Sequence, residues 1–247
     1  MHKKFLTLLS ALLVSSMGFA SGSTENHLKE VLHKALPGYT VTKVESSEME
    51  GMYSEQLSGS DWIYVSKDGR FVFPGKMLSI QGDKIVDLTE KKLGDARKNS
   101  LAAVKQDDMV VFSPEGKVKG IVYAFTDVDC GYCKKFHQEV PRLNDLGVEV
   151  RYLAWPRSGL GTDSVTYNKM KSVWCAKDRK VAMTQSKQGK RLATADKECS
   201  TPIPNQFKLG ASLGVRGTPA LFLEDGTRAG GYRKADDLAR DMGISLK

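Results

Sequence analysis

The chain has 247 residues and a formal net charge of +8, from 37 Lys and Arg against 29 Asp and Glu. This length supports one large domain or two modest ones, and four cysteines are too few for a small disulfide-rich scaffold. A hydrophobic fraction of 40% excludes wholesale disorder. The basic residues are spread along the chain and not gathered in one run, which argues against a nucleic-acid-binding protein.

Residues 1–20 have the order of a secretory signal peptide. Lys3 and Lys4 precede an apolar run over 5–14, and small residues follow at Gly18 and Ala20. The run is too short to cross about 30 Å of hydrocarbon, so we expect cleavage near Ala20 and not a membrane anchor. No later stretch is apolar enough for insertion into a membrane. We therefore predict an exported mature protein in a compartment where disulfides persist.

Residues 21–88 are predicted to form a small domain of one helix and several short strands. The helix is expected over 24–36, where apolar residues share one face. Strand-like runs flank turn signals at Asp68-Gly69 and Gly82-Asp83, which predicts two hairpins. A unit of this size has a marginal core and exposed sheet edges, so pairing with a second copy would stabilise it.

Residues 89–108 are charged and lack proline and aromatic residues. Their loose helical phase predicts a linker helix between two domains, and a surface helix within one domain would show the same pattern. Residues 109–247 alternate strand and helix patterns, which predicts an α/β domain. Its strands are expected at 118–126, 148–155 and 220–223, and its helices at 132–146 (with Pro141 as a kink or early stop), within 162–213 and at 234–242.

Cys130-Gly131-Tyr132-Cys133 lies at the junction between a predicted strand and a predicted helix. The free N–H groups and positive dipole end of a helix N-terminus favour the thiolate of Cys130. The thiolate is the attacking species in disulfide exchange, and Cys133, one turn further on, can resolve a mixed disulfide. The pattern therefore predicts a redox-active pair.

Three alternative roles for this motif have weaker support. A zinc site needs four ligands, and although His137 has suitable spacing for a third, no second CxxC exists. A c-type haem needs CxxCH, and Lys134 occupies the histidine position. A permanent structural disulfide is conceivable, but a strand–CxxC–helix order favours redox chemistry. We expect neither a metal nor a cofactor.

Two further features accompany the motif. Cys175 and Cys199 are far apart in the chain, and in an oxidising compartment we expect them to form a structural disulfide, with a second redox centre as the alternative. Thr218-Pro219 immediately precedes an apolar strand, where a proline marks a strand start or edge. A cis bond there would fit a tight functional turn, although most X-Pro bonds are trans.

Taken together, these motifs resemble the DsbC/DsbG family of bacterial periplasmic disulfide isomerases. The resemblance covers essentially the whole mature chain. The DsbG branch usually carries Pro-Tyr between its cysteines, so Gly131-Tyr132 and the second cysteine pair favour the DsbC branch. The resemblance rests on Thr126-Asp127, Cys130-Gly131-Tyr132-Cys133, 151–157, 174–178, Leu213-Gly214-Val215 and 217–220.

The resemblance implies an α+β N-terminal dimerisation domain, a linker helix and a C-terminal α/β thioredoxin-like domain with a helical insertion. Two chains would form a V-shaped homodimer whose cleft holds misfolded, disulfide-containing exported proteins in the periplasm. Cys130 would be the nucleophile, Cys133 the buried resolving thiol, and Thr218-Pro219 a cis-proline turn beside them. Cys175–Cys199 would match the family's structural disulfide. An isomerase must begin reduced, so a membrane electron donor of the DsbD type is implied.

The sequence also departs from the expected pattern. Asp129 places a carboxylate directly before the nucleophile, which would raise the pKa of Cys130. Ala124 stands where thioredoxins carry a buried acid, so proton handling should differ from theirs. The linker is also a few residues longer than expected. Alternative activities are reduction of sulfenic acids by a DsbG-like enzyme, dithiol oxidation, and client binding by a holdase that does not use Cys130.

Overall fold

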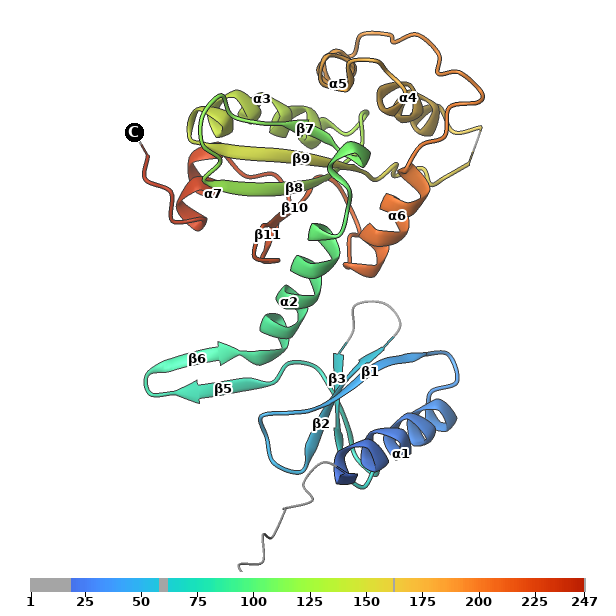
Figure 1. Cartoon of the computed structure of the whole chain (residues 1–247), viewed down its shortest axis with the longest axis vertical. Coiled ribbons are helices and arrows are strands. Elements are labelled where there is room, and N and C mark those ends of the chain that lie inside the picture. The colour runs from blue at the N-terminus through green and yellow to red at the C-terminus, as the bar shows by residue number, and fades with distance from the viewer. Residues whose placement is uncertain (1–18, 58–61, 162, 247) are drawn as a thin grey trace, which may run out of the picture. The chain divides into compact units, whose positions relative to one another are not determined.

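The computed structural model describes residues 19–57, 62–161 and 163–246, with side chains described from residue 22 onward (Figure 1). The chain divides into two compact units between Gly75 and Lys76. The predicted signal segment lies outside the described residues, apart from the backbone of its last two. Among the helices described, none has the length and apolar character needed to cross a membrane.

The N-terminal unit combines one helix with a four-stranded antiparallel sheet. Helix α1 (Phe19–Ala35) precedes strands in the spatial order β1-β2-β3-β4, and β1 and β4 form the edges. The predicted helix and the hairpin at Gly69 are confirmed, with Gly69 at a φ of +72° that favours glycine. The strands are β1 (Val41–Ser46), β2 (Met52–Leu57), β3 (Trp62–Ser66) and β4 (Val72–Pro74). The small core consists of Leu28, Leu32, Val44, Leu57, Ile63 and Val65.

The second unit begins with a hairpin and a helix. Strands β5 (Leu78–Gln81) and β6 (Lys84–Asp87) pair as predicted, and α2 (Leu88–Ala102) follows directly. The Asp87 carboxylate caps α2 by accepting a hydrogen bond from the Glu90 amide at 2.8 Å. Helix α2 ends at Ala102 and is therefore shorter than the helix predicted over 89–108. A separate 3-10 turn, η1 (Gln106–Asp108), follows it.

Helix α2 packs against the rest of the second unit through its C-terminal half. Arg97 is buried, and its Nε donates to the carbonyl of Gly226 at 2.7 Å. A Cβ on Gly226 would lie 1.9 Å from the Gly94 carbonyl oxygen, so this contact requires glycine. Leu101 is buried in the same region. The predicted linker segment is therefore a helix fixed to the C-terminal unit.

The main sheet of this unit has the strand order β11-β10-β8-β9-β7. Strands β8 (Gly120–Thr126) and β9 (Val148–Ala154) are parallel and joined by α3 (Gly131–Asp145), whereas the other pairs are antiparallel. The predicted strands and helices are confirmed within a few residues, and α3 continues past Pro141 instead of stopping there. The remaining strands are β7 (Val110–Phe112), β10 (Ala220–Leu223) and β11 (Arg228–Gly230).

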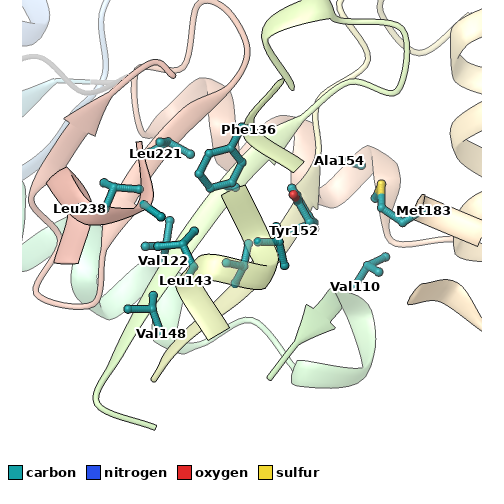
Figure 2. Close-up of a cluster of buried hydrophobic side chains, with 14 of the residues drawn as sticks. Val110, Val122, Phe136, Leu143, Val148, Tyr152, Ala154, Met183, Leu221 and Leu238 are labelled. Carbon is teal, nitrogen blue, oxygen red and sulfur yellow. The ribbon is translucent and has the colours of Figure 1, made fainter. Parts of the chain in front are cut away.

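Each face of the sheet carries its own hydrophobic core, because successive strand residues point to opposite sides. Val122 and Ala124 of β8 face the larger core beneath α3, shown in Figure 2, and Phe125 faces the smaller core near α2. Three helices form the predicted helical section between β9 and β10, and a helix closes the chain. They are α4 (Val165–Trp174), α5 (Arg179–Lys187), α6 (Ile203–Ser212) and α7 (Ala235–Asp241).

Candidate active site

Cys130 is the N-cap residue of α3, at the carboxyl end of β8. Its backbone is extended (φ −73°, ψ 121°), and its Sγ accepts a hydrogen bond from the backbone N–H of Cys133 at 3.4 Å. Gly131 is the first helical residue, and Tyr132 is 65% exposed. Both cysteines are free thiols, and both are buried. The strand-to-helix junction predicted for this motif is therefore present.

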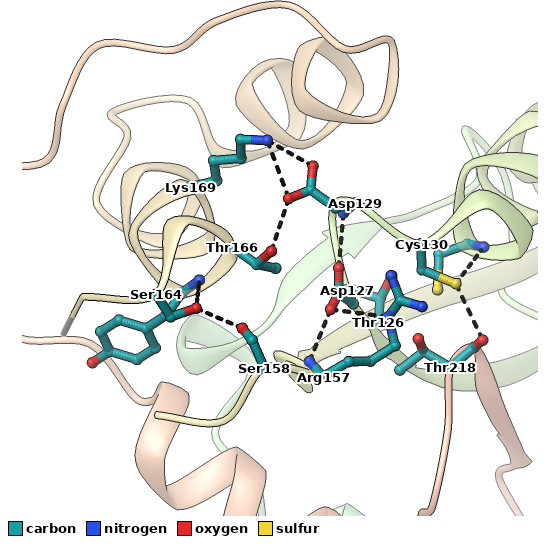
Figure 3. A network of polar contacts seen from close by, with 12 residues as sticks. Thr126, Asp127, Asp129, Cys130, Arg157, Ser158, Ser164, Thr166, Lys169 and Thr218 are labelled. Atoms are coloured by element: carbon teal, nitrogen blue, oxygen red, sulfur yellow. Dashed lines mark hydrogen bonds and ion pairs between the residues drawn. The ribbon is translucent and has the colours of Figure 1, made fainter. Parts of the chain in front are cut away.

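The surroundings lower the pKa of Cys130. Burial raises it, but interactions with Thr218 and Cys133 and the positive charge of Arg157 together outweigh burial. The Cys130 thiol also lies 3.2 Å from the carbonyl oxygen of Thr218, to which it donates when protonated (Figure 3). The structure thus favours a thiolate at Cys130, the form that attacks disulfides.

The two carboxylates before Cys130 have different partners. The Asp129 carboxylate turns toward α4, where it accepts hydrogen bonds from the Lys169 ammonium and the Thr166 hydroxyl, both at 2.8 Å (Figure 3). The buried Asp127 carboxylate accepts from the backbone N–H groups of Asp129 and Arg157, each at 2.8 Å, and pairs with the Arg157 guanidinium at 3.2 Å. Each carboxylate therefore has its own cationic partner. The Asp129 carboxylate was expected to raise the pKa of Cys130, but the pKa of Cys130 is lowered overall.

Thr218 and Pro219 lie directly beside the cysteines. The peptide bond between them is cis, as the family resemblance implied. The Thr218 hydroxyl oxygen is buried and has no hydrogen-bond partner among the described residues. A buried hydroxyl without a partner is unfavourable, and one next to a thiolate can donate to it. The hydroxyl is thus placed to respond to the ionisation of the neighbouring sulfur.

Cys133 has a different environment from Cys130. It is fully buried, and burial raises its pKa, although the nearby charge of Lys187 and hydrogen bonding from the Asp127 backbone and the Thr126 side chain oppose that rise. The two thiols of one motif therefore have pKa shifts of opposite sign. This is the arrangement expected of an attacking thiol and a protected resolving thiol.

His137 is held away from metal coordination. Its Nδ1 is 2.9 Å from the Tyr152 hydroxyl and its Nε2 is 3.0 Å from the Thr184 hydroxyl, so both nitrogens are engaged. Burial lowers its pKa to about 4. Throughout the part of the chain that the structure describes, no group of three or more His, Cys, Asp or Glu residues could hold a metal ion.

The second cysteine pair forms the predicted disulfide. Cys175 follows α4 directly, and its bond to Cys199 joins that helix to the segment before α6. The sequence did not single out Lys187 or Arg157 as parts of the site. Arg157 ends the family-like motif at 151–157 and could have been found there, whereas Lys187 lies in a polar stretch that resembles a solvated helix.

Comparisons with known proteins identify the families to which the two parts of the chain are similar. Residues 105–242 match the thioredoxin-like domain family, and residues 19–90 match the disulfide bond isomerase protein N-terminal domain. A thiol:disulfide interchange protein DsbC from Escherichia coli is 34% identical over 238 residues, which cover 96% of this chain and 94% of the relative. The Salmonella typhimurium protein of that name is 36% identical over 235 residues, which cover 94% of this chain and 92% of the relative.

Among solved structures, a disulfide interchange protein from Neisseria gonorrhoeae is 28% identical, with a TM-score of 0.48 over 57% of this chain and 96% of that chain. The family matches confirm the expected fold class, with an isomerase-type N-terminal domain followed by a thioredoxin-like domain. Over nearly its whole length, the chain belongs to the DsbC family of thiol:disulfide interchange proteins.

Proposed function

We propose that this protein isomerises non-native disulfides in exported proteins, with Cys130 as nucleophile and Cys133 as resolving thiol. The observation that carries the proposal is the opposite pKa shift of two free thiols at one helix N-terminus, lowered for Cys130 and raised for Cys133. An enzyme of this kind needs one sulfur ready to attack and a second held in reserve.

Isomerisation follows from exchange at Cys130. Its thiolate attacks one sulfur of a client disulfide, an S–S bond forms between Cys130 and the client, and the other client sulfur leaves as a thiolate. That thiolate attacks another client disulfide or displaces Cys130, which regenerates the enzyme. If the mixed disulfide persists, Cys133 attacks Cys130 and releases the client reduced. The enzyme then needs two electrons, which we propose a DsbD-type membrane donor supplies.

Residues around the sulfurs support binding of an extended client segment. Gly131 and Tyr132, which follow Cys130 directly, are exposed, and the Thr218 carbonyl oxygen lies 3.2 Å from the Cys130 sulfur. We propose that the Thr218 hydroxyl donates to whichever cysteine is ionised, since it has no competing partner in the described structure. Cys175–Cys199 is assigned a structural role.

The N-terminal unit supports a homodimer. Phe71, Val72 and Phe73 are 55%, 42% and 55% exposed, and the last two belong to the edge strand β4. An exposed apolar strand edge is suited to pairing with another chain. We propose that 21–88 is the dimerisation domain, 89–108 the linker and 109–247 the catalytic domain. We also propose that 1–20 is a signal peptide cleaved near Ala20, which directs the protein to the periplasm.

The test is reactivation of scrambled, fully oxidised ribonuclease by the reduced mature protein. The unsubstituted protein should restore ribonuclease activity, and Cys130→Ser should restore none. Cys133→Ser should retain the attack but accumulate a covalent complex with ribonuclease, visible on a non-reducing gel, which Cys130→Ser cannot form. If the unsubstituted protein and Cys130→Ser both fail to reactivate ribonuclease yet suppress aggregation, the protein is a holdase and the isomerase proposal is wrong.

A further inference from the structure

Lys187 is a buried cation directly beneath the active site. It is the last residue of α5 and is 5% exposed. Lysine is almost never buried without a charged partner, because the loss of hydration disfavours the ammonium form. Here its Nζ donates to two neutral oxygens, the Thr126 hydroxyl at 2.6 Å and the Asp127 carbonyl at 2.8 Å. These bonds fix the position of the amine without neutralising its charge.

The same two residues act on Cys133. Hydrogen bonding from the Thr126 side chain and the Asp127 backbone favours the Cys133 thiolate, as does the charge of Lys187. Conversely, a charge on Cys133 stabilises the Lys187 ammonium more than any other neighbouring group does, while burial lowers the pKa of Lys187 to about 8. The Thr126 hydroxyl therefore bonds the amine and also interacts with the resolving sulfur. At neutral pH the amine and ammonium forms are both populated.

Other ionisable groups around Lys187 cannot take its place. The carboxylate of Asp127 is already bonded by Arg157 and two backbone N–H groups, and the fully buried Ala124 carries no ionisable group. The groups that face Lys187 are Cys133, Lys134 and His137 from α3, Asp127 and Cys130 from the preceding turn, and Tyr152 from β9. His137 is uncharged in the neutral range because its pKa is about 4.

We propose that Lys187 is the proton-handling residue of the resolving step, acting on Cys133 through the hydroxyl of Thr126. This inference rests on the proposed function, since it requires that Cys133 attack a mixed disulfide on Cys130. The proton leaves Cys133 Sγ for the Thr126 hydroxyl, which passes its own proton to the neutral amine of Lys187. The Cys133 thiolate then forms a bond to Cys130 Sγ. The bond between Cys130 and the client breaks, and its electron pair leaves on the client sulfur, which takes a proton from solvent.

Stopped-flow reaction of the reduced full-length mature protein with dithiobis(nitrobenzoate) separates the two attacks. The first coloured thiolate is released when Cys130 attacks the reagent, at a rate proportional to reagent concentration. The second is released when Cys133 attacks the resulting mixed disulfide, at a rate independent of reagent concentration. Cys133→Ser, which should lack the second phase, identifies it. The pH profile of that phase is the measurement.

Lys187→Met should move the midpoint of the second-phase pH profile upward by about one unit or more and slow that phase about tenfold at pH 7. The first phase should change by less than about threefold. Lys190→Met, the same substitution at an exposed position three residues later, should leave both phases unchanged. A merely structural role of Lys187 would not shift a midpoint selectively in the second phase.

Thr126→Val provides an independent test, because it keeps the size of the side chain and removes the hydroxyl between Lys187 and Cys133. It should shift the second-phase midpoint in the same direction, and it decides the question if Lys187→Met does not fold. An unchanged midpoint in the folded variant overturns the role of Lys187 while leaving the isomerase proposal intact. Absence of the second phase in the unsubstituted protein would instead remove both the resolving role of Cys133 and this inference.

Discussion

The two units of the chain bury ionisable groups in different ways. In the N-terminal unit the Glu55 side chain is fully buried, and neither of its carboxylate oxygens has a hydrogen-bond partner among the described residues. In the C-terminal unit Lys187 is almost as deeply buried, but two oxygens hold its amine next to a reactive thiol. A buried charge with fixed partners beside a reactive group can serve chemistry, whereas one without partners only lowers stability.

The hydrophobic cores of the two units differ in size. Among the described residues, six buried hydrophobic residues form the N-terminal core, and the edge strand β4 exposes Phe73. The C-terminal unit has separate cores on both faces of its sheet and a disulfide in its helical section. We expect the smaller core to contribute less stability than the two cores of the larger unit, which contains the active site and its buried polar groups.

The largest effect should come from one substitution made in each core. Leu32 and Leu143 are 1% and 0% exposed, and each change to alanine should lower the free energy of unfolding by about 3 to 4 kcal/mol. The N-terminal unit should lose its structure with Leu32→Ala, because a core of this size supplies only a few kcal/mol. The C-terminal unit should remain folded with Leu143→Ala. Amide hydrogen exchange measures the protection of each unit in both variants. Protection retained in the N-terminal unit of Leu32→Ala would contradict the proposed difference between the two cores.

Removal of the disulfide should affect only the larger unit. Cys175 and Cys199 are 24 positions apart, so replacing both with alanine should lower its free energy of unfolding by about 3 kcal/mol. Denaturant unfolding followed separately for each unit tests this, with the N-terminal transition as internal control. Both phases of the dithiobis(nitrobenzoate) reaction should persist at neutral pH, since neither cysteine belongs to the active pair. A large loss of the first phase would assign the bond a role in redox chemistry.

Glu55 should make the stability of the N-terminal unit depend on pH. Burial raises its pKa from 4.5 to about 7 in the folded chain. Below pH 4.5 both states bind the proton; between pH 4.5 and 7 only the unfolded state releases it, so stability falls as pH rises. The loss should reach about 3 kcal/mol by pH 7 and stay constant above it. In Glu55→Gln, denaturant unfolding at several pH values should lack this decline, and an unchanged decline would exclude Glu55 as its cause.

Local sequence patterns predicted most of the fold because strand alternation, turn signals and the CxxC junction depend on near neighbours. The hairpins at Gly69 and Gly82 and the helix after Cys130 are examples. The predicted helix over 89–108 was too long, because no breaker follows Ala102 and its end is set by packing of Leu101 and Met109 on the sheet. Propensity could not reveal this tertiary limit.

The sequence likewise predicted most of the active site but not all of it. The cysteines, the cis-proline turn and the disulfide follow from motifs and their resemblance to a family. Lys187 does not, because its burial depends on how α5 packs over the end of β8. The Asp129 carboxylate was expected to raise the pKa of Cys130, yet that pKa is lowered overall, because adjacency in the chain does not determine where a carboxylate points.

The smallest predicted effect concerns which charged side chain controls the pKa of Cys130: the adjacent Asp129 or Arg157, which is more distant in the chain. Arg157 favours the Cys130 thiolate, but its side chain is half exposed, so solvent weakens its influence. Arg157→Gln should therefore raise the pKa of Cys130 modestly and slow its alkylation about threefold at pH 6, with the difference shrinking as the pH rises and both proteins approach full ionisation of the thiol. Asp129→Asn should change the rate less, although Asp129 is the adjacent residue, because its carboxylate is paired with Lys169. If Asp129→Asn instead accelerated alkylation more than Arg157→Gln slowed it, the carboxylate would control the thiol despite pointing away from it.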